Sequence, residues 1–127
     1  MNLPENLTYT QDHVWMKKDG DEYVFGITDF AQSELGEIVF IELPEVGKEL
    51  KSGEVICVAE SSKAVSEVYA PIGGVISEVN TALEDDPSIV NNDPYEAGWI
   101  VKYKVINEND LQLPKLITKA QYEEFIS

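Results

Sequence analysis

The segment Glu54-Val-Ile-Cys-Val-Ala-Glu60, Ser61-Ser-Lys-Ala64, Val65-Ser-Glu-Val-Tyr-Ala70 is the most informative part of this chain. Runs rich in Val, Ile and Tyr stand on both sides of small or polar residues, a pattern that favours two antiparallel strands joined by a tight turn. We expect Ser61 and Ser62 to close the turn through side-chain hydrogen bonds to nearby backbone, and Ala64 to leave space around its neighbour. The pattern therefore predicts a β-hairpin with Lys63 at its tip, projecting away from the sheet.

Strand-like runs of the same kind recur along the chain, separated by Gly, Pro, Asn and Asp about every ten residues, which is typical of all-β proteins. Asp19-Gly20-Asp21 between the first two runs is a hairpin turn signal. A chain of 127 residues with this rhythm predicts one all-β dominated domain over residues 1–127. The further runs are His13–Lys18, Glu22–Thr28, Glu37–Leu43, Val75–Val79 and Trp99–Val105.

A short internal helix is expected after the second of these runs. Asp29 with Gln32 three residues on forms a capping-box start, and Gly36 provides the left-handed exit. The stretch Thr81–Gly98 has no clean period and carries several Asn and Pro residues, so it is predicted to be a long surface loop with one helical turn.

A second helix is expected at the C-terminus. Thr118 and Gln121 repeat the capping-box spacing, and Ile117 with Tyr122 fits a hydrophobic staple. This helix is expected to pack on the sheet.

Charge and composition narrow the classes of partner. The chain holds 24 acidic and 9 basic residues, a net charge of −15, and this excludes a non-specific grip on nucleic acid or on an anionic membrane. Partners should present basic or mixed surfaces. One cysteine allows no internal disulfide, and the chain shows neither a signal or transit segment nor an apolar run of spanning length. The expected location is therefore the cytoplasm.

The residue types that usually carry catalysis are scarce. Cys57 lies mid-strand and is expected to be a small buried packing residue, and the single His13 is expected to be a hydrogen-bonded structural side chain. The acidic run Glu84-Asp85-Asp86 lacks the alternation of a calcium loop and is interpreted as a solvated loop. The segment Trp99–Tyr103 is expected to pack in or beside the core. No catalytic site and no metal site are predicted.

Lys63 has two interpretations on local sequence alone. A lysine at a hairpin apex has the geometry needed for enzymatic attachment of a long acyl group, because the modifying enzyme must surround the amine without meeting strand backbone. An ordinary solvated lysine in a polar turn gives the same pattern.

A resemblance to a known family favours the first interpretation. Glu60-Ser61-x-Lys63-Ala64 and Val68-Tyr69-Ala70-Pro71 resemble the lipoyl-lysine motif, and the whole chain resembles the H proteins of the glycine cleavage system. Biotin carriers instead place Met on both sides of the lysine. Lipoyl domains of 2-oxoacid dehydrogenases lack the additional segments that carry the resemblance. These segments are His13-x-Trp15, Gly26-Ile-Thr-Asp29-x-Ala31-Gln32, Leu35-Gly36-x-Ile38-Val39, Glu42-Leu-Pro44-x-x-Gly47, Val79-Asn80-x-x-Leu83, Asp93-Pro-Tyr95 and Gly98-Trp99.

The resemblance implies a fold, a cofactor and an attachment site. The fold would be a barrel-sandwich hybrid of two antiparallel sheets with the two helices attached. Lipoate would be bound covalently to Lys63, within an attachment motif formed by Glu60, Ser61, Ser62 and Ala64.

The resemblance also implies a function. The chain would be a carrier, not an enzyme, that takes the aminomethyl group of glycine from a pyridoxal-phosphate glycine decarboxylase to a tetrahydrofolate-dependent aminomethyltransferase. A dihydrolipoamide dehydrogenase would reoxidise the arm, and a lipoate ligase or an octanoyl or lipoyl transferase would attach it.

The sequence departs from the family near the hairpin. The usual His-Glu-Trp is His13-Val14-Trp15, which removes a carboxylate expected to shelter the loaded arm; Glu67 replaces the usual Asp and is a possible arm contact, and Ser62 replaces the usual Val. These changes support an alternative, an H-like lipoyl relay that donates lipoate to 2-oxoacid dehydrogenase complexes.

Overall fold

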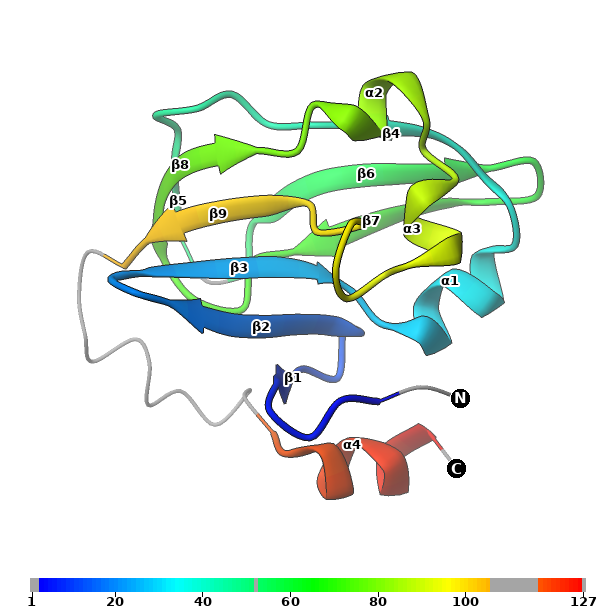
Figure 1. Ribbon diagram of the computed structural model, residues 1–127, viewed down its shortest axis with the longest axis horizontal. Coiled ribbons are helices and arrows are strands. Elements are labelled where there is room, and N and C mark those ends of the chain that lie inside the picture. The colour runs from blue at the N-terminus through cyan, green and yellow to red at the C-terminus, as the bar shows by residue number, and fades with distance from the viewer. Residues whose placement is uncertain (1–2, 52, 106–116, 127) are drawn as a thin grey trace.

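Two antiparallel sheets make up most of the computed structural model, which describes residues 3–51, 53–105 and 117–126 (Figure 1). In spatial order the larger sheet holds β1 (Thr8–Tyr9), β2 (Val14–Asp19), β3 (Glu22–Ile27), β9 (Val101–Lys104), β8 (Gly74–Val79) and β5 (Glu49–Leu50). The smaller sheet holds β4 (Ile38–Glu42), β6 (Val55–Ser61) and β7 (Val65–Tyr69). The predicted strands are present with ends shifted by at most two residues, and the barrel-sandwich hybrid is confirmed.

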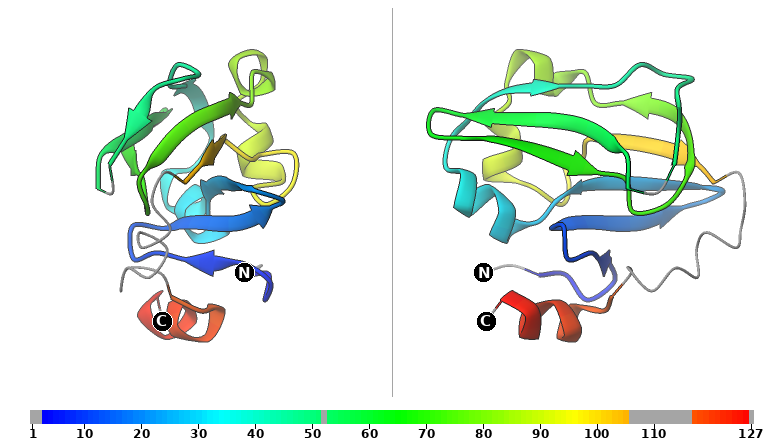
Figure 2. Two further views of the ribbon diagram at one scale, coloured as in Figure 1. Left: turned by 90° about the vertical axis from the view of Figure 1, so that its left-hand side faces the viewer. Right: turned by 180° about the vertical axis from the view of Figure 1, so that it is seen from behind.

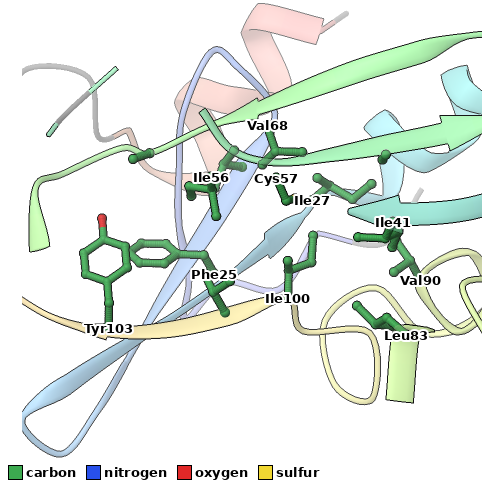
Figure 3. Packing of buried hydrophobic residues seen from close by; sticks show 14 of the residues in the cluster. Phe25, Ile27, Ile41, Ile56, Cys57, Val68, Leu83, Val90, Ile100 and Tyr103 are labelled. Atoms are coloured by element: carbon green, nitrogen blue, oxygen red, sulfur yellow. The ribbon is translucent and has the colours of Figure 1, made fainter. Parts of the chain in front are cut away.

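The two sheets share one hydrophobic core. Inward-facing side chains of the larger sheet, such as Phe25 and Tyr103 with ring centroids 4.2 Å apart, meet Ile41 and Cys57 of the smaller sheet (Figure 3). Burial of each large aliphatic or aromatic side chain contributes about 1.5–3 kcal/mol to folding. Gly74 is required here because a Cβ at this position would overlap the Tyr103 ring.

The segment from residue 99 to residue 103 packs as predicted. Ile100, Val101 and Tyr103 are buried in the shared core, and Trp99 is half-buried against a second cluster. That second cluster includes Tyr9, Trp15 and Tyr122 at the C-terminal helix.

The internal helix α1 (Asp29–Leu35) forms where it was expected, but its cap was misassigned by one residue. Thr28 is the N-cap, because its Oγ1 accepts a hydrogen bond from the Ala31 N–H, while Asp29 is the first helical residue and accepts from the Gln32 side chain. Gly36 ends the helix with φ of 81°, as predicted.

The prediction of a long surface loop over residues 81–98 was wrong. This stretch forms two short helices, α2 (Ala82–Asp85) and α3 (Ile89–Asn92). Leu83 and Val90 are fully buried on the core from these helices. The sequence predicted a loop because turn-forming Asn and Pro residues dominate this stretch. The burial of Leu83 and Val90 is decided by tertiary packing, which the local sequence does not show.

The terminal helix α4 (Lys119–Ile126) begins with the predicted capping box, in which the Thr118 N–H donates to Gln121 Oε1 and the Gln121 N–H donates to Thr118 Oγ1. Tyr122 of this helix stacks on Tyr9 of β1 with centroids 5.0 Å apart. The helix therefore lies against the edge of the larger sheet (Figure 1). Within the described residues, every helix is too short or too polar to cross a membrane.

Candidate functional site

Hydrogen bonds of Ser61 close the turn between β6 and β7. The Ser61 N–H donates to the Ala64 carbonyl at 2.8 Å, and Ser61 Oγ accepts from the backbone N–H groups of Lys63 at 3.2 Å and Ala64 at 3.0 Å. These bonds are the side-chain closure expected of Ser61. The expectation that Ser62 also closes the turn was wrong: among the described residues no hydrogen bond involves its side chain, so Ser61 alone closes the turn.

Lys63 lies exposed at the tip of this hairpin. No described carboxylate forms an ion pair with its Nζ. The hairpin tip extends to one end of the molecule, with α1 beside it (Figure 2, right). Below the tip, Ala59 and Val68 are buried on the inner face of the sheet, which anchors the hairpin in the core. The amine of Lys63 is therefore accessible to solvent, at the end of a hairpin whose strands are anchored in the core.

A cleft of about 390 Å³ opens beside the hairpin. Its apolar walls come from β3, α1 and β7, and include the buried side chains Ile27, Leu35 and Val68. His13 and Phe30 also line it, with ring centroids 4.9 Å apart. An extended, largely apolar chain tethered nearby has a complementary surface here.

Three acidic residues line the same cleft: Asp12 before β2, Glu34 on α1 and Glu67 on β7. Val14 is not among the lining residues and is wholly buried in the core. The sequence predicts Glu67 as a possible arm contact, but no sequence motif singles out Asp12 or Glu34. The three acidic residues are far apart in the sequence, and only the fold brings their segments together. Their grouping could therefore not be predicted from the sequence.

His13 is held by the C-terminal helix. Its Nδ1 lies 2.7 Å from the hydroxyl of Tyr122, which also lies 2.8 Å from Oγ1 of Thr28. Burial lowers the pKa of His13 below its ordinary value of 6.5, and the nearby Asp12 and Glu34 oppose that effect less strongly. The structural role predicted for His13 agrees with this hydrogen bond.

Residues of the segment 81–98 hold α1 in place by hydrogen bonds. Because α1 lines the cleft, these bonds also fix one wall of the cleft. Asn91 donates from its side-chain amide to Gln32 Oε1 at 2.9 Å and to the Gly36 carbonyl at 2.8 Å, and its Oδ1 accepts from the Ile38 N–H at 2.9 Å. The hydroxyl of Tyr95 accepts from the Asp29 N–H at 2.9 Å. Both ends of α1 are therefore fixed from outside the helix.

Cys57 is placed as the sequence predicted, whereas Glu84 and Asp85, predicted to lie in a loop, belong to α2. Cys57 is buried, and burial raises the pKa of its thiol to about 12, which leaves it protonated and unreactive at neutral pH. Glu84, Asp85 and Asp86 are exposed. Within the part of the chain that the structure describes, no three His, Cys, Asp or Glu side chains are grouped as metal ligands would be.

Comparison with known proteins gives one consistent family. The model of the family described as "Glycine cleavage H-protein" matches residues 7–127. The H protein of Halothermothrix orenii is 48% identical over 126 residues, covering 99% of this chain and 97% of that protein. The glycine cleavage system H protein of Bacillus licheniformis is 50% identical, covering 99% and 98%.

A solved structure agrees with these sequence matches. The crystal structure of a glycine cleavage system H protein from Mycobacterium marinum superposes with a TM-score of 0.87 at 38% identity, covering 96% of this chain and 97% of the other. The similarity therefore extends across both sheets and their connections.

Proposed function

Because the chain belongs to the glycine cleavage H-protein family, we propose that it is the lipoylated carrier of the glycine cleavage system, with lipoate attached to Nζ of Lys63. The observation that carries this proposal is an exposed lysine at the tip of a hairpin whose turn is fastened by Ser61. Glu60, Ser61, Ser62 and Ala64 form the surrounding attachment motif.

The residues around Lys63 fit such a group. Lipoate in amide linkage would supply a dithiolane that takes up two electrons and the one-carbon amine unit of glycine. Lys63 holds the linkage point in solvent, and the cleft provides an apolar surface of Ile27, Leu35 and Val68 beside it.

The cleft is proposed to shelter the loaded arm. A cationic amine at the end of the arm is attracted by the carboxylates of Asp12, Glu34 and Glu67, which line the cleft together. His13 stays neutral at physiological pH because its pKa is lowered, so it adds no opposing positive charge. These residues hold the amine and exclude bulk water from one side of it.

The proposed partners are a pyridoxal-phosphate glycine decarboxylase, a tetrahydrofolate-dependent aminomethyltransferase and a dihydrolipoamide dehydrogenase. Tethering to Lys63 gives the reactive sulfurs a high effective concentration at each docked enzyme. The net charge of −15 favours fast, salt-sensitive docking on basic surfaces. The chain itself acts as a carrier, since its one thiol is buried and its one imidazole is held by Tyr122.

The attachment site is tested by intact mass after expression with lipoate available. One lipoyl adduct is expected on the unmodified chain and none on Lys63→Arg, which keeps the charge. Lys48→Arg is the matched control, because Lys48 is also exposed but lies on the β4–β5 connection. An adduct that persists in Lys63→Arg, or disappears in Lys48→Arg, contradicts the assignment.

A second measurement distinguishes the lipoyl relay from the carrier of the glycine cleavage system. The missing carboxylate at position 14 favours the relay, but Asp12 and Glu34 supply negative charge to the cleft from other positions. Lipoylated protein is incubated with glycine and the decarboxylase, and exchange of carbon dioxide is followed. Exchange is the expected result; its absence, with transfer of lipoate to an acyltransferase subunit, identifies the relay.

A further inference from the structure

Exposed apolar side chains gather beside the hairpin tip. Among the described residues six large hydrophobic side chains are exposed, and three of them, Val39 at 54%, Phe40 at 49% and Val65 at 65%, lie at the tip end of the smaller sheet. We call these three residues the hairpin patch. Exposed apolar clusters of this kind mark interaction surfaces.

Strand register places Phe40 and Val65 of the hairpin patch on the outer face of the sheet. Phe40 pairs with Glu60, and Glu60 pairs with Val65, so Phe40, Glu60 and Val65 form one row across β4, β6 and β7. Val39 lies next to this row, at the irregularity in the pairing between Ile38 and Phe40, and is exposed. The neighbouring residues Ile41 and Ala59 face the core. The row lies only two or three residues along the strands from Lys63, roughly 7–10 Å at the usual strand rise.

Acidic side chains lie within this row and beside it. Glu60 lies between Phe40 and Val65, and the next row across the sheet pairs Glu42 and Glu67 with Val58. A complementary surface would thus place an apolar contact within a border of Lys or Arg side chains.

We propose that the hairpin patch is the contact surface for the enzyme that attaches lipoate to Lys63, a partner with an apolar surface bordered by basic side chains. This rests on the proposed function. An enzyme that acts at Nζ must enclose the turn, whereas enzymes that act at the far end of a long arm need not touch it. A typical interface covers about 800 Å² on each partner, so a footprint centred on Lys63 includes both rows.

Lipoylation kinetics test this proposal. A lipoate ligase joins the carboxyl group of lipoate to Nζ as an amide while ATP is cleaved to AMP and pyrophosphate, and the adduct is followed by intact mass. Phe40→Ser should raise KM for the carrier about tenfold with little change in kcat, as expected for a central aromatic contact. Val65→Thr, nearly isosteric and compatible with a strand, should raise KM about threefold.

Val46→Thr is the matched control. Val46 is 60% exposed but lies on the β4–β5 connection, and its variant should match the unmodified chain. Thermal unfolding of each variant checks that the fold is retained, and Val65→Thr keeps the test decisive if Phe40→Ser is unstable.

Three results would overturn the proposal. The first is that Phe40→Ser and Val65→Thr are both lipoylated with the same KM as Val46→Thr. The fully lipoylated variants could fail only with the aminomethyltransferase, which would assign the patch to that enzyme. Sedimentation could show a dimer that Phe40→Ser dissociates, which would make the patch a self-association surface. Failure of the proposed function looks different, because the unmodified chain would then not be lipoylated at all.

Discussion

The hydroxyl of Tyr122 lies 2.7 Å from Nδ1 of His13, which joins the C-terminal helix to the wall of the cleft. The same hydroxyl lies 2.8 Å from Oγ1 of Thr28, the N-cap of α1. His13 and α1 both line the cleft. One oxygen atom from the last helix therefore connects two segments that form the candidate site.

Removal of this hydroxyl should destabilise the fold. Tyr122→Phe keeps the ring that stacks on Tyr9 but loses the contacts to His13 and Thr28, at a cost of about 1–2 kcal/mol in the free energy of unfolding. Urea denaturation measures the change. Tyr69→Phe is the control, because among the described residues the Tyr69 hydroxyl has no hydrogen bond; equal effects in both variants would contradict the role of Tyr122.

His13 should make stability depend on pH in a defined direction. Its pKa in the folded chain lies below the ordinary 6.5, so between the two values the unfolded chain binds more protons than the folded one. This contribution to stability is complete above 6.5 and is lost as the pH falls towards the folded pKa.

The variant His13→Asn isolates that contribution. His13 has φ of 68°, a backbone conformation that Asn tolerates, and Asn does not titrate. Urea midpoints compared at about pH 7.5 and about pH 5.5 should fall less for the variant than for the unmodified chain. An imidazole that titrates above 6.5 by NMR would refute the prediction.

Cys57 should resist thiol reagents in the folded protein. Its thiol is buried, and the pKa of about 12 leaves very little thiolate at neutral pH. Iodoacetamide followed by intact mass should give no adduct under native conditions and one adduct in denaturant. Rapid native labelling would mean that β6 opens far more readily than its burial indicates.

The three cleft carboxylates should lengthen the lifetime of the one-carbon unit on the lipoylated carrier. Combined Asp12→Asn, Glu34→Gln and Glu67→Gln substitutions remove the negative charge that attracts the amine, so ammonia release without tetrahydrofolate should accelerate several-fold. The rate of lipoyl attachment should change less than the rate of ammonia release, and any change should come from Glu67, which also borders the hairpin patch.

Glu37→Gln provides the control for this experiment. Glu37 is exposed and does not line the cleft, so its substitution should leave ammonia release unchanged. A triple variant that behaves like Glu37→Gln would exclude an electrostatic role for the cleft.

Local chemistry explains where the sequence predicted correctly. The β6–β7 hairpin follows from apolar runs on both sides of a polar turn, and the capping box of Thr118 and Gln121 involves residues three positions apart. The prediction of a helix at residues 29–35 was also correct, but its N-cap was not. Thr28 and Asp29 are both favourable N-cap residues, and only the backbone conformation selects Thr28.

The sequence by itself determined the strand order along the chain, the exposed position of Lys63 and the family, because these depend on near neighbours and on motifs in a fixed order. Tertiary structure alone decided the cleft. Asp12, Glu34 and Glu67 come from three separate segments, and they line one space only because two sheets and α1 pack on a shared core. The same packing buries Val14 in the core, a placement that no local pattern contains.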